Sequence, residues 1–321
     1  MPPRGISRRS SPSASAARRP AGAPDPMTTV ADRVLDGPHG PLRVRTYVPA
    51  APAAAGLVWA HGGGFAHGDL DMPEADGVAR AFAELGIAVV SVDYRLAPPF
   101  RYPVAREEVA FAYAWAAASD LTTGPWALGG ASAGANLATG ATLKTLHAGG
   151  ETPPLLVLAY PTLHPVQPAP DDALRAALDA EPDADRFGPD VVSAMYENYL
   201  GAPVSTADVY AAPGLASAAE LAGFPPTIMI NDEVDELRVS GEAFAQTLRA
   251  ARVDVACSTE PGTQHGHLNR PEEGAAQPSI ERFAARILAL ASHDPDPDPR
   301  PTRTTPTTSA PQSLSADATT P

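Results

Sequence analysis

Short apolar runs alternate along the chain with longer stretches in which apolar residues recur at helical spacing. The short runs, rich in Val, Ile, Leu and Ala, predict buried strands at residues 42–48, 56–60, 87–92, 125–129, 155–160, 227–230 and 253–258. The longer stretches predict helices at residues 73–85, 104–118, 133–148, 191–200, 239–250 and 279–291. This alternation predicts an α/β fold, with a mostly parallel sheet flanked by helices.

The alternation breaks between residues 164 and 213, where polar loops and a single predicted helix replace the expected strand. An excursion of this kind is where α/β enzymes insert a cap over the active site. We therefore expect one domain at residues 28–292, with a small helical cap at about 164–213. The Arg-, Ser- and Pro-rich residues 1–27 predict a disordered leader, and the Pro-, Thr- and Ser-rich residues 293–321 predict a disordered tail.

Charge and cysteine content narrow the class of protein. The 321 residues include 37 Asp and Glu against 23 Lys and Arg, so the net charge of −14 argues against nucleic acid as a partner. Cys257 is the only cysteine, and no Cys/His cluster has the spacing of zinc ligands. No apolar run reaches the roughly 18 residues of a membrane span. We expect a cytoplasmic protein and keep a homodimer open as its assembly state.

The strongest chemical signal is the sequence Gly130-Ala131-Ser132-Ala133-Gly134, between a predicted strand and a predicted helix. A serine nucleophile in this setting stands on a sharp, strained turn, and its neighbours must be small. The helix that follows directs its positive end towards a developing oxyanion. The pattern therefore predicts Ser132 as the nucleophile.

A second signal is the sequence HGGGF at residues 61–65, directly after a predicted strand. Consecutive glycines cost conformational entropy, but they let main-chain amides approach a reacting oxygen. We expect the amides of Gly63, Gly64 and Ala133 to form an oxyanion hole. A plain glycine turn is the structural alternative, whereas a phosphate loop lacks its Gly-Lys-Ser/Thr or G-x-G-x-x-G pattern here.

An acid and a base follow the nucleophile along the chain. Asp235 comes after a predicted strand and His265 after the last one, in the order serine, acid, histidine that is seen in α/β hydrolases. His265 would accept the serine proton, and Asp235 would hold the imidazole in the required tautomer. Asp232 and Glu233 are rivals for the acid, and His267 is a rival for the base.

Other residues have structural explanations. His61 is expected to brace the glycine loop rather than to catalyse. Met195, Tyr196 and Tyr199 on the predicted helix at 191–200 either line an acyl pocket or pack the cap, and the pattern does not separate these alternatives.

Four ordered motifs together resemble the hormone-sensitive-lipase-like family of esterases, which carries the α/β-hydrolase fold-3 signature. They are HGGGF at 61–65, DYRLAP at 93–98, GASAG at 130–134 and DELR at 235–238. The resemblance covers residues 56–290. It implies an eight-stranded sheet, a helical cap, no cofactor or metal, and hydrolysis of short- to medium-chain acyl esters.

Two features depart from that family. It usually places His-Gly-Phe at the catalytic histidine, whereas His265-Gly266 is followed here by His267. It also usually begins with helices that contribute to the cap, whereas strand-like sequence begins here by about Val30. A thinner cap would leave the acyl pocket more open.

The residues and the resemblance lead to one main hypothesis, a serine carboxylesterase that acts on a small-molecule ester through an acyl-enzyme. The same triad also serves amidases, peptidases, lactonases and acyltransferases, which the sequence does not exclude. A non-catalytic ligand-binding protein on a hydrolase scaffold is the alternative from another class. The intact set of Ser132, Asp235 and His265 disfavours it.

Overall fold

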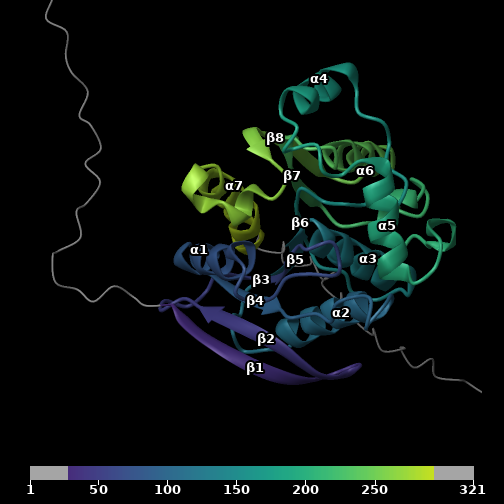
Figure 1. The fold of residues 1–321 in the computed structure, drawn as a ribbon. Coiled ribbons are helices and arrows are strands. Elements are labelled where there is room, and N and C mark those ends of the chain that lie inside the picture. The colour runs from purple at the N-terminus through teal and green to yellow at the C-terminus, as the bar shows by residue number, and fades with distance from the viewer. Residues whose placement is uncertain (1–27, 293–321) are drawn as a thin grey trace, which may run out of the picture.

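Residues 28–292 are described by the computed structural model, and the predicted leader and tail lie outside them. The sheet has eight strands in the order β1-β2-β4-β3-β5-β6-β7-β8, with helices on both faces (Figure 1). The strands are β1 (Thr29–Gly37), β2 (Gly40–Val48), β3 (Ala55–Ala60), β4 (Ile87–Val92), β5 (Trp126–Ala131), β6 (Leu156–Ala159), β7 (Thr227–Val234) and β8 (Val255–Gln264). The helices are α1 (Val78–Glu84), α2 (Val104–Ala117), α3 (Ala133–His147), α4 (Asp172–Ala180), α5 (Pro189–Leu200), α6 (Arg238–Ala250) and α7 (Ala276–Ser292).

The sheet is mostly parallel. β1 and β2 form an antiparallel hairpin, β2 pairs antiparallel with β4, and every other pairing is parallel. Every residue of β3, β4, β5 and β6 is buried, because helices cover both faces of a parallel sheet. These strands therefore read as continuous apolar runs in the sequence. The predicted α/β fold with an eight-stranded sheet is confirmed.

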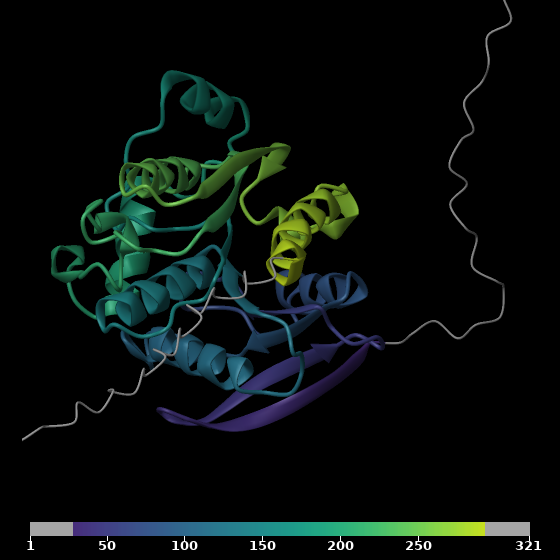
Figure 2. The same cartoon turned by 180° about the vertical axis from the view of Figure 1, so that it is seen from behind.

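Helices cover both faces of the sheet, as the opposite views of Figures 1 and 2 show. One apolar core lies on each face. Val58 and Ala60 of β3 point into the core beneath α2, α3 and α6. Leu57 and Trp59 of the same strand point into the core beneath α1 and α7. This alternation follows from the two-residue period of a β-strand. The sheet is thus held from both sides, and its carboxyl ends form a firm base for the loops.

The chain leaves the sheet between β6 and β7, where α4 and α5 lie. Helix α4 corrects our expectation of polar loops in this stretch. The carboxylate of Asp171 caps α4 by accepting a hydrogen bond from the Leu174 amide (2.8 Å). Leu174 and Leu178 are buried against Val234. Two apolar residues in one short helix give too weak a periodic pattern to be recognised in the sequence.

The loops that follow β3, β5, β7 and β8 gather at the carboxyl edge of the sheet, which is where open α/β sheets bind ligands. Among the helices at residues 28–292, none combines the length and apolar character that crossing a bilayer demands. Gly63, Gly64, Ser132, Asp235 and His265, for which the sequence predicts a chemical role, all lie at this edge.

Candidate active site

Ser132 stands on a strained turn between β5 and α3. Its φ of 50° and ψ of −114° lie in a region that L-residues rarely adopt. A Cβ on Gly130 would lie 2.6 Å from the carbonyl oxygen of Ala60, and a Cβ on Gly134 would overlap the same oxygen. Both glycines are therefore required by the close approach of β3, and the turn presents the serine hydroxyl at the sheet edge.

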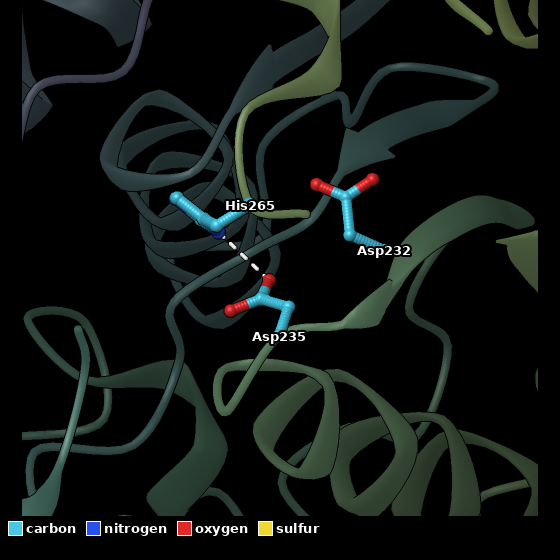
Figure 3. Close-up of side chains that lie close together, drawn as sticks. All are labelled: Asp232, Asp235 and His265. Atoms are coloured by element: carbon cyan, nitrogen blue, oxygen red, sulfur yellow. Dashed lines mark hydrogen bonds and ion pairs between the residues drawn. The ribbon is translucent and has the colours of Figure 1, made fainter. Parts of the chain in front are cut away.

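His265 lies between Ser132 and Asp235. Its Nε2 is 3.0 Å from the Ser132 Oγ, and its Nδ1 is 2.7 Å from the Asp235 Oδ2. Figure 3 shows the Asp235 carboxylate directed at the imidazole. The other oxygen of Asp235 accepts a hydrogen bond from the Leu237 amide (3.0 Å). The three residues follow β5, β8 and β7, so the fold brings together groups that lie far apart in the sequence.

The three side chains differ in their access to solvent. Ser132 and His265 are 6% and 9% exposed, and Asp235 is 0% exposed. A substrate can therefore reach the hydroxyl and the imidazole but not the carboxylate. Burial alone would lower the pKa of His265, but the neighbouring carboxylates of Asp235, Asp232 and Glu74 outweigh it and raise that pKa above its ordinary value of 6.5.

The rivals Asp232 and His267 bind each other instead. The Asp232 carboxylate contacts His267 Nδ1 with one oxygen and accepts the Gly266 amide with the other (2.8 Å). His267 Nε2 lies 3.0 Å from the hydroxyl of Ser279. Both members of this second pair are fully buried. The structure therefore separates two Asp–His pairs, of which only the His265 pair contacts the Ser132 hydroxyl.

Glu233, the other rival acid, points away from the site. Its side chain is exposed, and its Oε2 accepts a hydrogen bond from the Gly262 amide (2.7 Å). It therefore contacts the end of β8 rather than the imidazole of His265.

The glycine loop after β3 adopts positive φ at Gly63 (112°) and Gly64 (59°). Both residues line the cavity beside Ser132. Within residues 28–292, the amides of Gly63, Gly64 and Ala133 donate no hydrogen bond to another protein group. Main-chain donors left open next to a serine hydroxyl are what an oxyanion requires.

Glu74 supports this loop from below, and sequence reasoning missed it. Its carboxylate accepts hydrogen bonds from the Gly62 amide (2.6 Å) and from the Tyr160 hydroxyl (2.7 Å), and it is 2% exposed. It belongs to a short helical turn at Pro73–Gly77, whose Glu74 carbonyl accepts the Trp59 indole N–H (2.8 Å). Only its place in a predicted amphipathic helix marked it, and an acidic residue there is normally exposed.

His61 braces the loop, as the sequence predicted. Its ring stacks on Tyr94 with centroids 4.4 Å apart, and its Nδ1 lies 2.7 Å from the carbonyl oxygen of Gly62. The Tyr94 hydroxyl donates to the His61 carbonyl (2.8 Å). Burial lowers the pKa of His61, which favours a neutral structural ring. Tyr94 of the aspartate-tyrosine-arginine motif at 93–95 thus supports the start of the glycine loop.

A cavity of about 440 Å³ opens above Ser132. Met195 of α5 lines it, together with Met72 and Phe187. Tyr196 and Tyr199 instead pack inside, where the Tyr199 ring stacks on Phe65 at 4.1 Å and the Tyr196 hydroxyl accepts from Asn136 (2.8 Å). Met195 therefore faces the cavity, whereas Tyr196 and Tyr199 pack the interior.

A metal ion has some potential ligands here, since oxygen or nitrogen atoms of Asp232, Asp235 and His265 lie within 4.8 Å of one another (Figure 3). Each side chain is already engaged, however. Asp232 binds His267 and the Gly266 amide, while Asp235 binds His265 and the Leu237 amide. Hydrogen bonds account for the whole cluster, so its donor set does not fit a metal centre.

The region in which this chain is similar to known proteins contains Ser132, Asp235 and His265. The family model for the alpha/beta hydrolase fold matches residues 57–269. The chain is 35% identical over 254 residues to the carboxylic ester hydrolase LipN of Mycobacterium tuberculosis. The aligned region covers 75% of this chain and 64% of LipN. It is 34% identical over 253 residues to the carboxylesterase NlhH of the same organism. That alignment covers 76% of this chain and 73% of NlhH. The chain thus spans just under two thirds of LipN.

The architecture is shared with solved structures as well. An esterase of Pyrobaculum calidifontis superposes with a TM-score of 0.73 at 31% identity, over 83% of this chain and 87% of the esterase.

Proposed function

Because the chain belongs to the hormone-sensitive-lipase-like group of the alpha/beta hydrolase fold family, we propose that it is a serine carboxylesterase. One observation carries the proposal: His265 lies within hydrogen-bond distance of both the Ser132 hydroxyl (3.0 Å) and the Asp235 carboxylate (2.7 Å). The relatives LipN, a carboxylic ester hydrolase, and NlhH, a carboxylesterase, favour esters over other acyl compounds.

The reaction passes through an acyl-enzyme. Ser132 Oγ attacks the ester carbonyl carbon while His265 Nε2 accepts the hydroxyl proton. The tetrahedral intermediate collapses, the imidazolium returns that proton to the departing alcohol oxygen, and the acyl group stays on the serine. Water then attacks the acyl carbon with His265 again as the base, and the acid leaves. Asp235 keeps the proton on Nδ1, so that Nε2 is free to accept.

The oxyanion of each tetrahedral intermediate is stabilised by the amides of Gly63, Gly64 and Ala133. Two features support this assignment: the amides have no other acceptor among residues 28–292, and α3 begins directly after Ser132. Donors fixed before the reaction need no reorganisation, and each one contributes about 3–4 kcal/mol to the barrier reduction.

Short- to medium-chain acyl groups fit the site. The cavity of about 440 Å³ lies at the lower end of the range of small-molecule pockets, and Met195 closes one side of it opposite Gly64. A long acyl chain would have to extend into solvent, where its methylene groups gain no burial energy.

The test is a panel of p-nitrophenyl esters with acyl chains from acetyl to dodecanoyl, supplemented by p-nitroanilides and lactones. We expect hydrolysis of the shorter esters and stoichiometric labelling by a fluorophosphonate. Ser132→Ala should abolish both, with a drop in kcat of at least about 10⁵-fold.

Ser205→Ala, a serine in the cap outside the cavity lining, is the matched control and should keep wild-type activity and labelling. Equal activity of wild type and Ser132→Ala would contradict the proposal. So would a protein that neither cleaves these esters nor reacts with the fluorophosphonate.

A further inference from the structure

Two arginines meet at the rim of the cavity, and the reaction described above uses neither. Arg186 comes from the cap between α4 and α5, and Arg270 follows the loop of His265. Both donate to the main-chain carbonyl of His265, from Arg186 Nη2 at 3.4 Å and from Arg270 Nη1 at 3.2 Å. Both line the cavity that contains Ser132. Two guanidinium groups thus converge on one oxygen beside the catalytic imidazole.

This pair carries more positive charge than its surroundings neutralise. Arg270 forms an ion pair with Glu273 (2.9 Å), but within residues 28–292 Arg186 has no carboxylate at ion-pair distance. The guanidinium of Arg186 lies over the Phe187 ring, 5.8 Å from its centroid. Like charges so close repel each other, and an anion placed between them would remove that repulsion.

The other carboxylates around the cavity and the two histidines are occupied by other partners. Glu74 lines the cavity but is 2% exposed and binds the Gly62 amide and the Tyr160 hydroxyl. Asp232 and Asp235 are fully buried and bind the two histidines. An exposed cationic rim in a chain of net charge −14 is therefore open to an anion from solution.

The position of the pair decides which part of an ester it faces. His265 Nε2 delivers the proton to the departing alcohol oxygen, so the alcohol portion leaves on the side of the histidine loop. The oxyanion donors Gly63 and Gly64 lie on the other loop, after β3. Because both arginines bind the carbonyl of His265, they lie on the alcohol side.

We propose that Arg186 and Arg270 form a binding site for an anionic group on the alcohol portion of the ester, so that the preferred substrates are acyl esters of hydroxy acids. This inference rests on the proposed esterase function. Guanidinium and carboxylate groups form charge-assisted, often bidentate hydrogen bonds, which gives the site its selectivity.

The experiment compares two matched ester pairs. In the first pair, 4-acetoxybutanoate and the neutral ketone 5-acetoxypentan-2-one differ only in charge on the alcohol side. In the second pair, monoethyl succinate and ethyl levulinate differ only in charge on the acyl side. We expect the charged member of the first pair to have a kcat/KM about tenfold higher at low salt. This preference should shrink as salt rises, and the second pair should show no such preference.

Variants of Arg186 test the residue directly, since its exposed side chain is not needed for folding. Arg186→Gln should bring the first ratio close to one, and Arg186→Glu should bring it below one. Arg33→Gln is the matched control, because Arg33 lies on β1 at the opposite edge of the sheet. It removes the same charge and should leave the ratio as in wild type.

Three results would overturn the inference. They are a wild-type ratio of one or less for the first pair, a preference for charge on the acyl side, and a ratio that Arg186→Glu does not move. Hydrolysis of the neutral esters in any of these cases leaves the proposed esterase function intact. Failure to cleave every ester together with failure of fluorophosphonate labelling defeats the esterase function itself, and this inference with it.

Discussion

The imidazole of His267 binds the carboxylate of Asp232, parallel to the pair that His265 forms with Asp235. Asp232 also holds the amide of Gly266, between the two histidines. The second pair therefore fixes the loop that carries His265. This pair holds His265 in position and does not line the cavity itself, because it is fully buried.

His267→Phe should lower the free energy of unfolding by about 3 kcal/mol. The substitution leaves the buried Asp232 carboxylate without its imidazole, and breaking one partner of a buried pair is strongly destabilising. It also removes the contact with the hydroxyl of Ser279. The kcat should fall less than tenfold, because the His265 pair stays intact. Urea unfolding and ester hydrolysis measure the two effects.

His39→Phe is the control for that substitution. His39 forms an exposed pair with Glu107 at 2.8 Å, and exposed pairs contribute less than about 1 kcal/mol. A loss of more than a hundredfold in kcat for His267→Phe, with unchanged unfolding, would show instead that His267 takes part in the reaction.

The pH dependence of hydrolysis should report the raised pKa of His265. Only the neutral imidazole accepts the serine proton, so kcat/KM should rise with pH through an apparent pKa above 6.5. Asp235→Asn removes the nearest of the carboxylates that raise this pKa. The rise should then begin at a lower pH, and kcat should fall about 10³- to 10⁴-fold.

The raised pKa of His265 also affects stability, and here the effect falls as pH rises, whereas kcat/KM increases. A histidine whose pKa is raised by folding contributes stability below its unfolded-state pKa, and this contribution disappears as pH rises through the folded-state pKa. The free energies of unfolding of wild type and Asp235→Asn, measured by denaturant titration, should therefore differ most below the unfolded-state pKa of His265. They should approach each other as pH rises through its folded-state pKa. If kcat/KM instead rose with pH over the same range in both proteins, the assignment of Asp235 would be contradicted.

Gly134→Ala should damage both stability and activity. The new methyl group would overlap the carbonyl oxygens of Ala60 and His61, so β3 or the turn at Ser132 has to move. We expect a loss of about 1–3 kcal/mol in the free energy of unfolding and a marked loss of kcat.

Gly77→Ala provides the matched comparison. Gly77 has a φ of −63°, and apart from its chain neighbours and its own helix backbone no atom lies within 4 Å of the added methyl group. This substitution should raise the free energy of unfolding by up to about 1 kcal/mol and leave hydrolysis unchanged. Similar melting temperatures for the two variants would disprove the steric argument.

Glu74→Ala should lower kcat about 10- to 100-fold with a smaller change in KM. The glycine loop loses the carboxylate that holds the Gly62 amide, and small displacements of positioned groups are costly in rate. Tyr160→Phe removes only the second contact of Glu74 and should have a smaller effect. A larger effect of Tyr160→Phe than of Glu74→Ala would refute this role.

Much of the fold could be predicted because its central strands are buried on both faces. β4 begins and ends at the predicted residues, 87 and 92. β7 and β8 extend to Val234 and Gln264, four and six residues beyond the predicted ends. These extensions are polar, contain a bulge between Asp232 and Val234, and are stabilised by pairing with each other. Apolar periodicity does not detect such pairing.

The site was predictable where the chemistry demands a local motif. The turn at Ser132 and the glycine loop need small residues at fixed spacing, so the sequence reveals them. The sequence favoured Asp235 but did not exclude Asp232, because Asp232 near the end of β7 and Asp235 just after it differ mainly in the direction of their side chains. Glu74 and Arg186 carry no motif, and only the tertiary fold brings them to the cavity.

The sheet order has a consequence for how such an enzyme would fail on heating. Ser132 follows a central strand, whereas Asp235 and His265 follow β7 and β8, the last two strands at one edge. Within the described sheet, β8 is hydrogen-bonded to a single neighbour, and peripheral elements open before the interior does. Opening of β8 would displace the imidazole of His265 while β5, the strand before Ser132, is still folded. For the proposed esterase, loss of activity on heating should therefore follow the opening of β8, and reinforcement of that strand should protect activity more than an equal gain at the centre.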